Sequence, residues 1–494
     1  MVSVAQRVIA DSPRTGRVAL RSFDQSRVEW DRSNDERETD EVAKLRTQGR
    51  VSRPACDEMS ARGSARVDGT RREEILGIAA SLFASSGYLG CSLNDVSQAC
   101  GILPGSLYHH FDSKEAIAVE LVERYHADLE SLGKLALTKL EGRGAAAVFD
   151  DIVTLARALA KTSVDHRAAL QLTLYEPPSG AGARLVELAQ WHPENLRRAL
   201  DRLLRRARTA GLLQAGISPL VVAEQIYTCM RRLAIPVSSD PLDAERSADT
   251  LCHMLLGGIA EGVAPDNVLD ASAAMAAANE SVRVWEEEAG EPGNDKEGLV
   301  LAVARSEFAR RGYEATTIRD IASAAGLATG TVYRFVDSKS SLLTTIMGAY
   351  YNRLSRAYRD VLSSGSGIVE QIDALVWVNI NSLRLFPDEF EIQHSWFREV
   401  PPDGETMQEL QAERTAELSG AVGAALVSGD LRLWNLPNSP AWREMFVTSL
   451  HSLIWTPPDI VQRLGNRKTH AYVRKTVLRG ATPLGDLDQR DVPV

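Results

Sequence analysis

The stretch GILPGSLYHHFDSKEAI, residues 101–117, recurs later in the chain as GLATGTVYRFVDSKSSL, residues 326–342. Between 82–125 and 307–350, thirteen of 44 aligned positions are identical, and several others exchange one apolar residue for another. Similarity this ordered indicates an internal duplication. We therefore expect two copies of one folding unit in the chain, whose 494 residues already favour two to four domains.

Both copies carry the same signals for helix starts. Apolar residues at helical spacing predict a first helix in each copy, with Ile75, Ile78, Ala79, Leu82 and Phe83 in one and Val300, Val303, Ala304 and Phe308 in the other. The patterns Ser92-x-x-Asp95 and Thr317-x-x-Asp320 then predict a capped second helix, because hydroxyl and carboxylate oxygens satisfy the free N–H groups of a first turn.

A tight turn and another short helix follow in each copy. Gly101 and Gly326 are expected to end the second helix, since glycine adopts the left-handed conformation without strain. The next helices are predicted over 104–111 and 329–336, and a longer one begins near Lys114 in the first copy. Two short helices joined in this way form a helix-turn-helix, whose second helix, here called the reading helix, enters the major groove of DNA.

The polar and exposed positions around each reading helix are the candidate DNA contacts. They are Ser92, Leu103, Pro104, Ser106, Tyr108, His109 and Lys114 in the first copy, and Thr317, Ala328, Thr329, Thr331, Tyr333, Arg334 and Lys339 in the second. Hydroxyl groups can donate to phosphates, and Arg334 can reach a guanine edge or a phosphate. Lys114 and Lys339, each at a helix start, are expected to complete a phosphate clamp.

The segments FASSGYLGCSLNDVSQACGILPGSLYHHFDSKEAI and FARRGYEATTIRDIASAAGLATGTVYRFVDSKSSL each resemble the N-terminal domain of TetR-family transcriptional regulators. The resemblance rests on the signature Gly-Ser/Thr-x-Tyr-x-x-aromatic-x-Ser-Lys. It implies an all-α fold with two tandem units, each a three-helix DNA-binding domain followed by a larger helical domain that binds a small molecule and dimerises. In that family the positions of Ser106, Tyr108, His109 and Lys114, and of Thr331, Tyr333, Arg334 and Lys339, face DNA.

The second copy departs from this signature at one place. Val336 stands where the first copy has Phe111, and Phe335 replaces His110. The shifted aromatic ring either loosens the packing against the first helix or approaches a thymine methyl group, and the sequence leaves both open.

Composition suggests the boundaries between domains. Residues 1–69 hold thirteen Lys/Arg and twelve Asp/Glu with little periodic apolar character, which predicts a disordered leader, and translation from Met59 is a hypothesis that would remove most of it. The acidic, Gly/Pro-marked stretch 266–294 is expected to be a linker. The remaining segments are expected to be DNA-binding domains at 70–125 and 295–350, helical ligand-binding and dimerisation domains at 126–265 and 351–480, and a tail at 481–494.

Several classes of protein are disfavoured. No apolar run approaches the ~20 residues that span a bilayer, and no signal peptide opens the chain, so we expect a cytoplasmic protein without membrane partners. Five cysteines without a Cys-x-x-Cys pair argue against disulfides and zinc, and the adjacent His109 and His110 point to different sides of a helix, so no metal or cofactor is expected. The net charge of −10 repels DNA overall, so local geometry must provide any binding.

The effector is expected to be a small apolar or amphipathic molecule bound in a helical domain. The weak candidates for contacts with it are Tyr175, Tyr227, His394, Trp396 and Arg398. The second unit is also rich in tryptophan, but such rings more often fill a core or an interface than line a pocket.

These features predict a ligand-responsive repressor released from a double-stranded operator by its effector. Two unlike units could pair within one chain as a pseudo-dimer, burying 220–260 against 441–456, and read an asymmetric site. Alternatively, only the first copy binds DNA, the second is a scaffold, and whole chains form a homodimer on a palindrome. A third alternative is an enzyme that uses the helical cavity, although the sequence shows no phosphate loop or nucleophile–base pattern.

Overall fold

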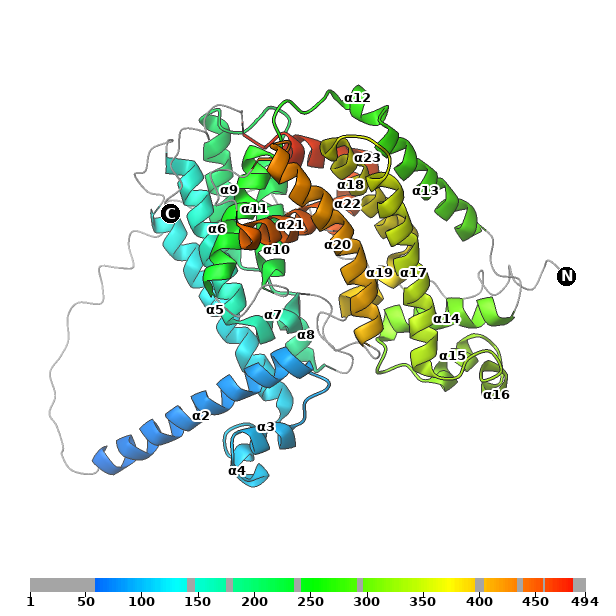
Figure 1. Ribbon diagram of the computed structural model, residues 1–494. Coiled ribbons are helices and arrows are strands. Elements are labelled where there is room, and N and C mark those ends of the chain that lie inside the picture. The colour runs from blue at the N-terminus through cyan, green and yellow to red at the C-terminus, as the bar shows by residue number, and fades with distance from the viewer. Residues whose placement is uncertain are drawn as a thin grey trace, which may run out of the picture. The chain divides into compact units, whose positions relative to one another are not determined.

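The computed structural model describes residues 58–139, 147–174, 181–234, 241–290, 296–395, 404–432, 439–455 and 458–482. The chain divides into two units, Met1–Arg71 and Arg72–Val494, and the contacts described below lie within the second. Every regular element in the described ranges is a helix (Figure 1), so the all-α prediction is confirmed. In the same ranges, no helix combines the length and the apolar composition needed to cross a membrane.

The duplication is visible as two equivalent series of helices. The first series is α2 (Glu58–Ser86), α3 (Leu93–Ala99), α4 (Pro104–Tyr108) and α5 (Lys114–Lys139). The second is α14 (Lys296–Arg311), α15 (Ile318–Ala324), α16 (Thr329–Val332) and α17 (Lys339–Leu362). The reading helices α4 and α16 are shorter than predicted, because the chain turns after Tyr108 and Val332 to bring Phe111 and Val336 into the core.

The shifted aromatic residue of the second copy packs inward. Phe111 is buried beneath the guanidinium group of Arg72, 4.4 Å from the ring centroid. Val336 takes the corresponding buried place in the second copy, and the ring of Phe335 packs against the core at partial burial. This position favours a packing role for Phe335 over contact with a thymine methyl group.

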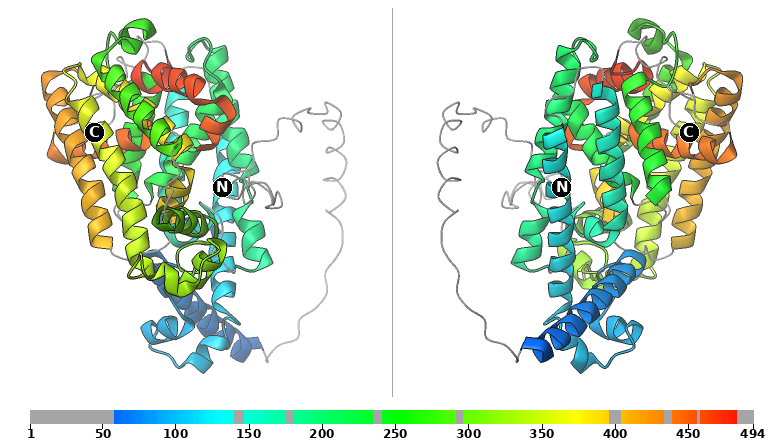
Figure 2. Two further views of the ribbon diagram at one scale, coloured as in Figure 1. Left: turned by 90° about the vertical axis from the view of Figure 1, so that its right-hand side faces the viewer. Right: turned by 90° about the vertical axis from the view of Figure 1, so that its left-hand side faces the viewer.

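The first helical domain continues from α5. It contains α6 (Val148–Asp165), α7 (Arg167–Thr173), α8 (Ala183–Ala189), α9 (Glu194–Thr209), α10 (Pro219–Leu233) and α11 (Pro241–Gly257). α5 packs on α9 and α6, while α6 also packs on α10 and α11 (Figure 2). α9 buries leucine and alanine residues on one side and carries arginines on the other, which is the amphipathic pattern of a helix that covers a core.

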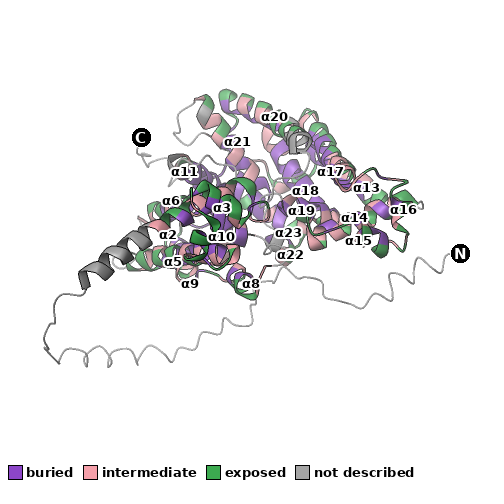
Figure 3. Cartoon of the chain, turned by 90° about the horizontal axis from the view of Figure 1, so that it is seen from below, coloured by how far each residue is buried: buried purple, intermediate pink, exposed green. Residues whose placement is uncertain are grey.

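The second helical domain is built around α18 (Ile368–Leu385), which is buried along most of its length (Figure 3). The domain also contains α19 (Pro387–Ser395), α20 (Gly404–Ser428), α21 (Pro440–Ile454), α22 (Pro458–Leu464), α23 (Asn466–Val473) and the π-helical turn η3 (Arg474–Leu478). α18 packs on α17, α21 and α23.

Three of the expected segments differ in the structure. The expected linker 266–294 forms α12 (Asp266–Asp270) and α13 (Ala273–Gly290), and α13 packs on α17 and α18. Its buried residues follow helical spacing among alanines, a pattern that the Gly/Pro-rich end of the segment obscured: Ala274, Met275, Ala278, Val282 and Trp285. Helix α2 begins at Glu58, inside the expected leader, whose residues 1–57 lie outside the described ranges. Ala481 and Thr482 of the expected tail are buried.

The late helices of the two halves pack on each other within the chain. α10 and α11 both contact α21, as the sequence predicted for 220–260 and 441–456 (Figure 1). Polar contacts accompany this packing: Arg463 pairs with Glu224 at 2.6 Å, and the hydroxyl of Tyr472 donates to Gln225 at 2.8 Å. The two halves therefore share one continuous core.

We predict that Trp285→Ala destabilises the chain by about 3–5 kcal/mol, the usual range for removing a large buried aromatic residue. The ring is 3% exposed and meets Phe386 edge to face at 5.4 Å. Urea unfolding measures the change. Val268→Ala is the control, because Val268 lies in the same segment but is 48% exposed, and a similar loss in both variants would contradict a packed α13.

Candidate DNA interface and ligand region

The two reading helices begin with the same backbone geometry. The residues that precede them, Leu103 and Ala328, have φ and ψ of −71° and 146°, and of −71° and 143°. The two reading helices therefore begin alike but present different side chains.

The structure brings most of the predicted DNA contacts to the surface around each reading helix. Leu103, Pro104, Ser106, Tyr108 and His109 are exposed in the first copy, and Ala328, Tyr333 and Arg334 in the second, with Thr329 and Thr331 half-buried. Tyr108 and Tyr333 are 54% and 55% exposed, and neither hydroxyl makes a hydrogen bond within the described parts of the chain. These hydroxyls are therefore available to an external partner.

Ser92 and Thr317 cap the second helices. In the first copy the N–H of Ser92 donates to Asp95 at 2.7 Å, and the N–H of Asp95 donates to the Ser92 hydroxyl at 3.2 Å. Thr317 and Asp320 repeat both bonds at 2.8 and 3.2 Å, so the predicted capping boxes are confirmed. The hydrogen bond from Thr317 is the main reason that the pKa of Asp320 falls to about 2. Contact of either capping hydroxyl with phosphate stays a prediction.

Lys114 and Lys339 have partners inside the protein. The ammonium group of Lys114 donates to the carbonyl oxygens of Tyr88 at 2.8 Å and Cys91 at 2.9 Å, and lies 4.2 Å from the centroid of the Tyr88 ring. Lys339 makes the equivalent bond to the carbonyl of Tyr313 at 3.0 Å, with its ammonium 4.0 Å from that ring. Both lysines thus hold the loop before the second helix, and a phosphate contact by either stays a prediction.

We predict that Lys114→Met weakens DNA binding without changing its salt dependence, because the ammonium group positions a loop rather than neutralising a phosphate. Affinities measured over a range of salt concentrations test this. Arg334→Ala is the comparison, since its exposed side chain is a candidate phosphate contact. A fall of about 1 in the slope of log K against log salt for Lys114→Met would mean that the lysine does bind phosphate.

The candidate ligand residues do not form one site in the described parts of the chain. His394 is buried against Phe390, and its Nε2 atom lies 3.2 Å from Nη2 of Arg232 in α10, so it belongs to the contact between the halves. Tyr227 is half-buried in the first domain, where the guanidinium of Arg231 lies 5.1 Å from its ring centroid and burial raises its pKa to about 12. Tyr175, Trp396 and Arg398 lie outside the described residues.

The sequence did not single out a group of basic and aromatic side chains near Tyr227. His126 of α5 is buried and stacks on Trp191, with ring centroids 4.1 Å apart. Burial lowers the pKa of His126 to about 4, with smaller effects from the positive charges of Arg231 and His192. These residues come from three distant segments, which the packing of α5 against α8 and α9 and of α9 against α10 brings together. In the sequence, the only signal of this group was a single histidine on the apolar face of a predicted helix.

We predict that stability decreases as the pH falls from about 6.5 towards 4, in part because of His126. Its pKa in the folded protein is about 4, below the ordinary value of 6.5, so the unfolded chain takes up the proton first. His126→Phe keeps a ring beside Trp191 and should reduce proton uptake on unfolding in this window by about one. Denaturation at several pH values measures this, with His109→Phe at an exposed position as the control; equal slopes in both variants would refute the assignment.

Among the described residues, no group of three or more His, Cys, Asp or Glu side chains is placed to hold a metal ion. The four cysteines of the described residues, Cys91, Cys100, Cys229 and Cys252, are all buried. Burial raises the pKa of the thiols of Cys91 and Cys229, the latter to about 12, so both are held in the unreactive protonated form.

Comparison with known proteins gives matches in the two repeated regions. The profile described as "Bacterial regulatory proteins, tetR family" matches residues 75–121 and 300–346. The HTH-type transcriptional repressor KstR2 of Rhodococcus jostii (strain RHA1) is 43% identical over 84 residues, which cover 17% of this chain and 40% of that repressor. KstR2 of Mycolicibacterium smegmatis is 28% identical over 210 residues, covering 39% of this chain and 92% of that repressor.

The matches with the first three curated relatives cover only 40% to 45% of those relatives' length. Among solved structures, the ketosteroid transcriptional regulator KstR2 of Mycobacterium tuberculosis is similar at 22% identity, with a TM-score of 0.31. That match covers 37% of this chain and 95% of the regulator.

Proposed function

Because this chain belongs to the TetR family of bacterial regulatory proteins and carries two of the family's DNA-binding domains, we propose that it is a ligand-responsive repressor in which both domains read DNA. The observation that carries the proposal is the second reading surface. It keeps the capping box, the loop-holding Lys339 and an exposed Tyr333, on the same backbone as the first copy. A domain kept only as a scaffold would not need an exposed tyrosine at this position.

Local charge supports DNA binding by the second copy. Residues 70–125 contain four basic and seven acidic residues, whereas residues 295–350 contain seven and six. Arg334 adds an exposed positive charge where the first copy has His109. The net charge of the chain opposes binding, so hydroxyl and guanidinium groups around the reading helices provide the attraction.

We further propose that one chain acts as a dimer of its own two halves. The packing of α10 and α11 on α21 occupies the late helices with an intramolecular contact. Dimeric helix-turn-helix proteins read sites whose symmetry mirrors their own. Two halves with unlike reading helices therefore suit an asymmetric operator with two different half-sites.

Effector release would act through the long helices α5 and α17. Each begins at the end of its helix-turn-helix and packs among the helices of its own domain. A small apolar or amphipathic molecule that favours another packing of either core would move that helix and its reading helix with it. This function includes no catalytic step, and the protein would act on double-stranded DNA in the cytoplasm.

Selection of DNA sites from a random library at defined salt tests this function. We predict two unlike half-sites at a fixed spacing, bound by one chain. Tyr108→Ala and Tyr333→Ala should each weaken binding to the selected site, and Arg334→Ala should weaken binding about equally across sequences and lower the salt slope by about 1. Leu135→Ala, a similarly exposed residue of α5, is the control.

The opposite result is equally clear. A palindromic site bound by two chains, together with unchanged affinity in Tyr333→Ala, would leave the first copy as the only DNA reader and the second as a scaffold.

A further inference from the structure

We propose that a contact between two glycines, Gly258 and Gly480, fixes the position of one reading domain relative to the other. This contact, here called the glycine crossing, joins the end of α11 in the first half to the C-terminal segment, defined as residues 466–482. The inference rests on the proposed function in assuming that both domains read DNA. It adds residues that position the two domains without touching DNA.

The two backbones meet without intervening side chains. Gly258 and Gly480 have φ values of +80° and +85°, a conformation that favours glycine. A Cβ atom on Gly258 would lie 2.5 Å from the amide nitrogen of Gly480, and one on Gly480 would lie 2.6 Å from the carbonyl oxygen of Gly257. Neither distance is compatible with a side chain, so the crossing requires glycine on both sides.

Main-chain hydrogen bonds surround the glycine crossing. The N–H groups of Ala481 and Thr482 donate to the carbonyls of Leu255 and Leu256 at 3.1 and 2.8 Å. In the opposite direction, the N–H of Ile259 donates to the carbonyl of Val477 at 2.9 Å. The last described residues of the second half are thus bonded into the end of a helix of the first half.

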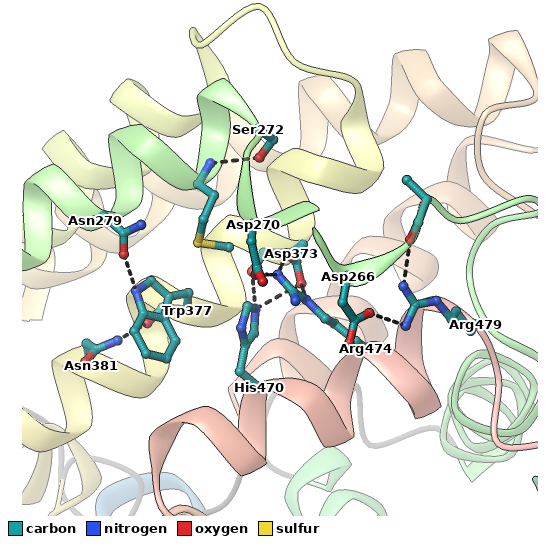
Figure 4. Close-up of polar contacts among 12 residues, drawn as sticks. Asp266, Asp270, Ser272, Asn279, Asp373, Trp377, Asn381, His470, Arg474 and Arg479 are labelled. Carbon is teal, nitrogen blue, oxygen red and sulfur yellow. Dashed lines mark hydrogen bonds and ion pairs between the residues drawn. The ribbon is translucent and has the colours of Figure 1, made fainter. Parts of the chain in front are cut away.

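The other end of the C-terminal segment is held by buried charges (Figure 4). Arg474 makes two hydrogen bonds to the buried carboxylate of Asp373 in α18, at 2.8 and 2.7 Å, and one to Asp270 in α12, at 2.7 Å. His470 lies 2.9 Å from the same Asp373 carboxylate. Arg479 pairs with Asp266 at 2.6 Å. The C-terminal segment therefore contacts three elements: α18, α11, and α12, which lies between the two halves in the chain.

These contacts connect the two reading domains through packed helices. On one side the segment packs on α11, which packs on α6, and α6 packs on α5. On the other side it packs on α18, which packs on α17. Because α5 and α17 begin at the two helix-turn-helix domains, a displacement at the glycine crossing would change the spacing of the reading helices.

Gly480→Ala tests the proposal with Gly429→Ala as a matched control. Gly429 has a φ of +86°, almost that of Gly480, but a Cβ atom there would meet nothing within 4 Å. Both substitutions therefore impose the same backbone strain, and only Gly480→Ala pushes the two halves apart. The first measurement is the affinity for the selected two-half-site DNA and for each half-site alone.

Gly480→Ala is expected to lose roughly 10- to 100-fold in affinity for the paired site, because the gain from binding two linked sites depends on their geometry. Its affinity for single half-sites should stay within about threefold of the unsubstituted chain, as should both affinities of Gly429→Ala. An unchanged ratio of paired to single affinity in Gly480→Ala would overturn the proposal.

A second measurement does not depend on DNA. Spin labels at Ala127→Cys in α5 and Ala416→Cys in α20, both exposed, report the distance between the halves on a Cys56→Ser background, because the other four cysteines are buried. We expect a narrow distance distribution in the unsubstituted chain and in Gly429→Ala, and a shifted or broadened one in Gly480→Ala. If paired DNA is bound no better than single half-sites by the unsubstituted chain, the proposed function fails, and this distribution still decides the role of the crossing.

Should Gly480→Ala not fold, Asp270→Ala can be used instead. It removes the ion pair between α12 and Arg474 of the C-terminal segment and leaves the glycine crossing unchanged. Asp270 is largely exposed, so its loss leaves the buried Asp373–Arg474 pair in place. Asp360→Ala, at an exposed position of α17, is the control for the lost charge. A broadened distribution of distances between the spin labels in Asp270→Ala, but not in Asp360→Ala, supports the proposal. The same distance distribution in both variants refutes it.

Discussion

The carboxylate of Asp373 is the constraint on which the joining of the two halves depends. A buried charge is costly unless it is paired and hydrogen-bonded. The side chain is 1% exposed in the second turn of α18, and its partners Arg474 and His470 both come from the C-terminal segment. That segment must therefore lie along α18, and from there its next residues reach α11. A local electrostatic requirement in one half thus determines where the chain meets the other half.

The DNA-binding domains could be predicted from the sequence because their signals are local. The capping residues Ser92 and Thr317, the glycines of the turns and the apolar spacing each act within a few residues, and the duplication provided a second reading of every signal. The exposure of Tyr108 and Tyr333 followed from the same pattern. Lys114 and Lys339 were placed on the correct helix starts, but their direction towards loop carbonyls depends on a contact 23 to 26 residues away in sequence.

The features that the sequence did not reveal arise from packing between distant segments. Helix α13 has six alanines among its 18 residues and few large apolar residues, so its buried face was obscured by the acidic and Gly/Pro-rich residues at its end. The His126 and Trp191 stack and the glycine crossing bring together residues far apart in the chain. A lone histidine or glycine carries no local signal of its eventual neighbour, which is why these sites became visible only in the folded chain.

The covalent link between the halves has a consequence for regulation at low abundance. A regulator made of separate subunits must associate before it binds, so its occupancy falls steeply once the subunits are diluted below their dissociation constant. Here α10, α11 and α21 pack within one polypeptide. Occupancy of a two-half-site operator by such a chain would rise with the first power of its concentration, so a few molecules in a cell would give a graded response rather than a threshold.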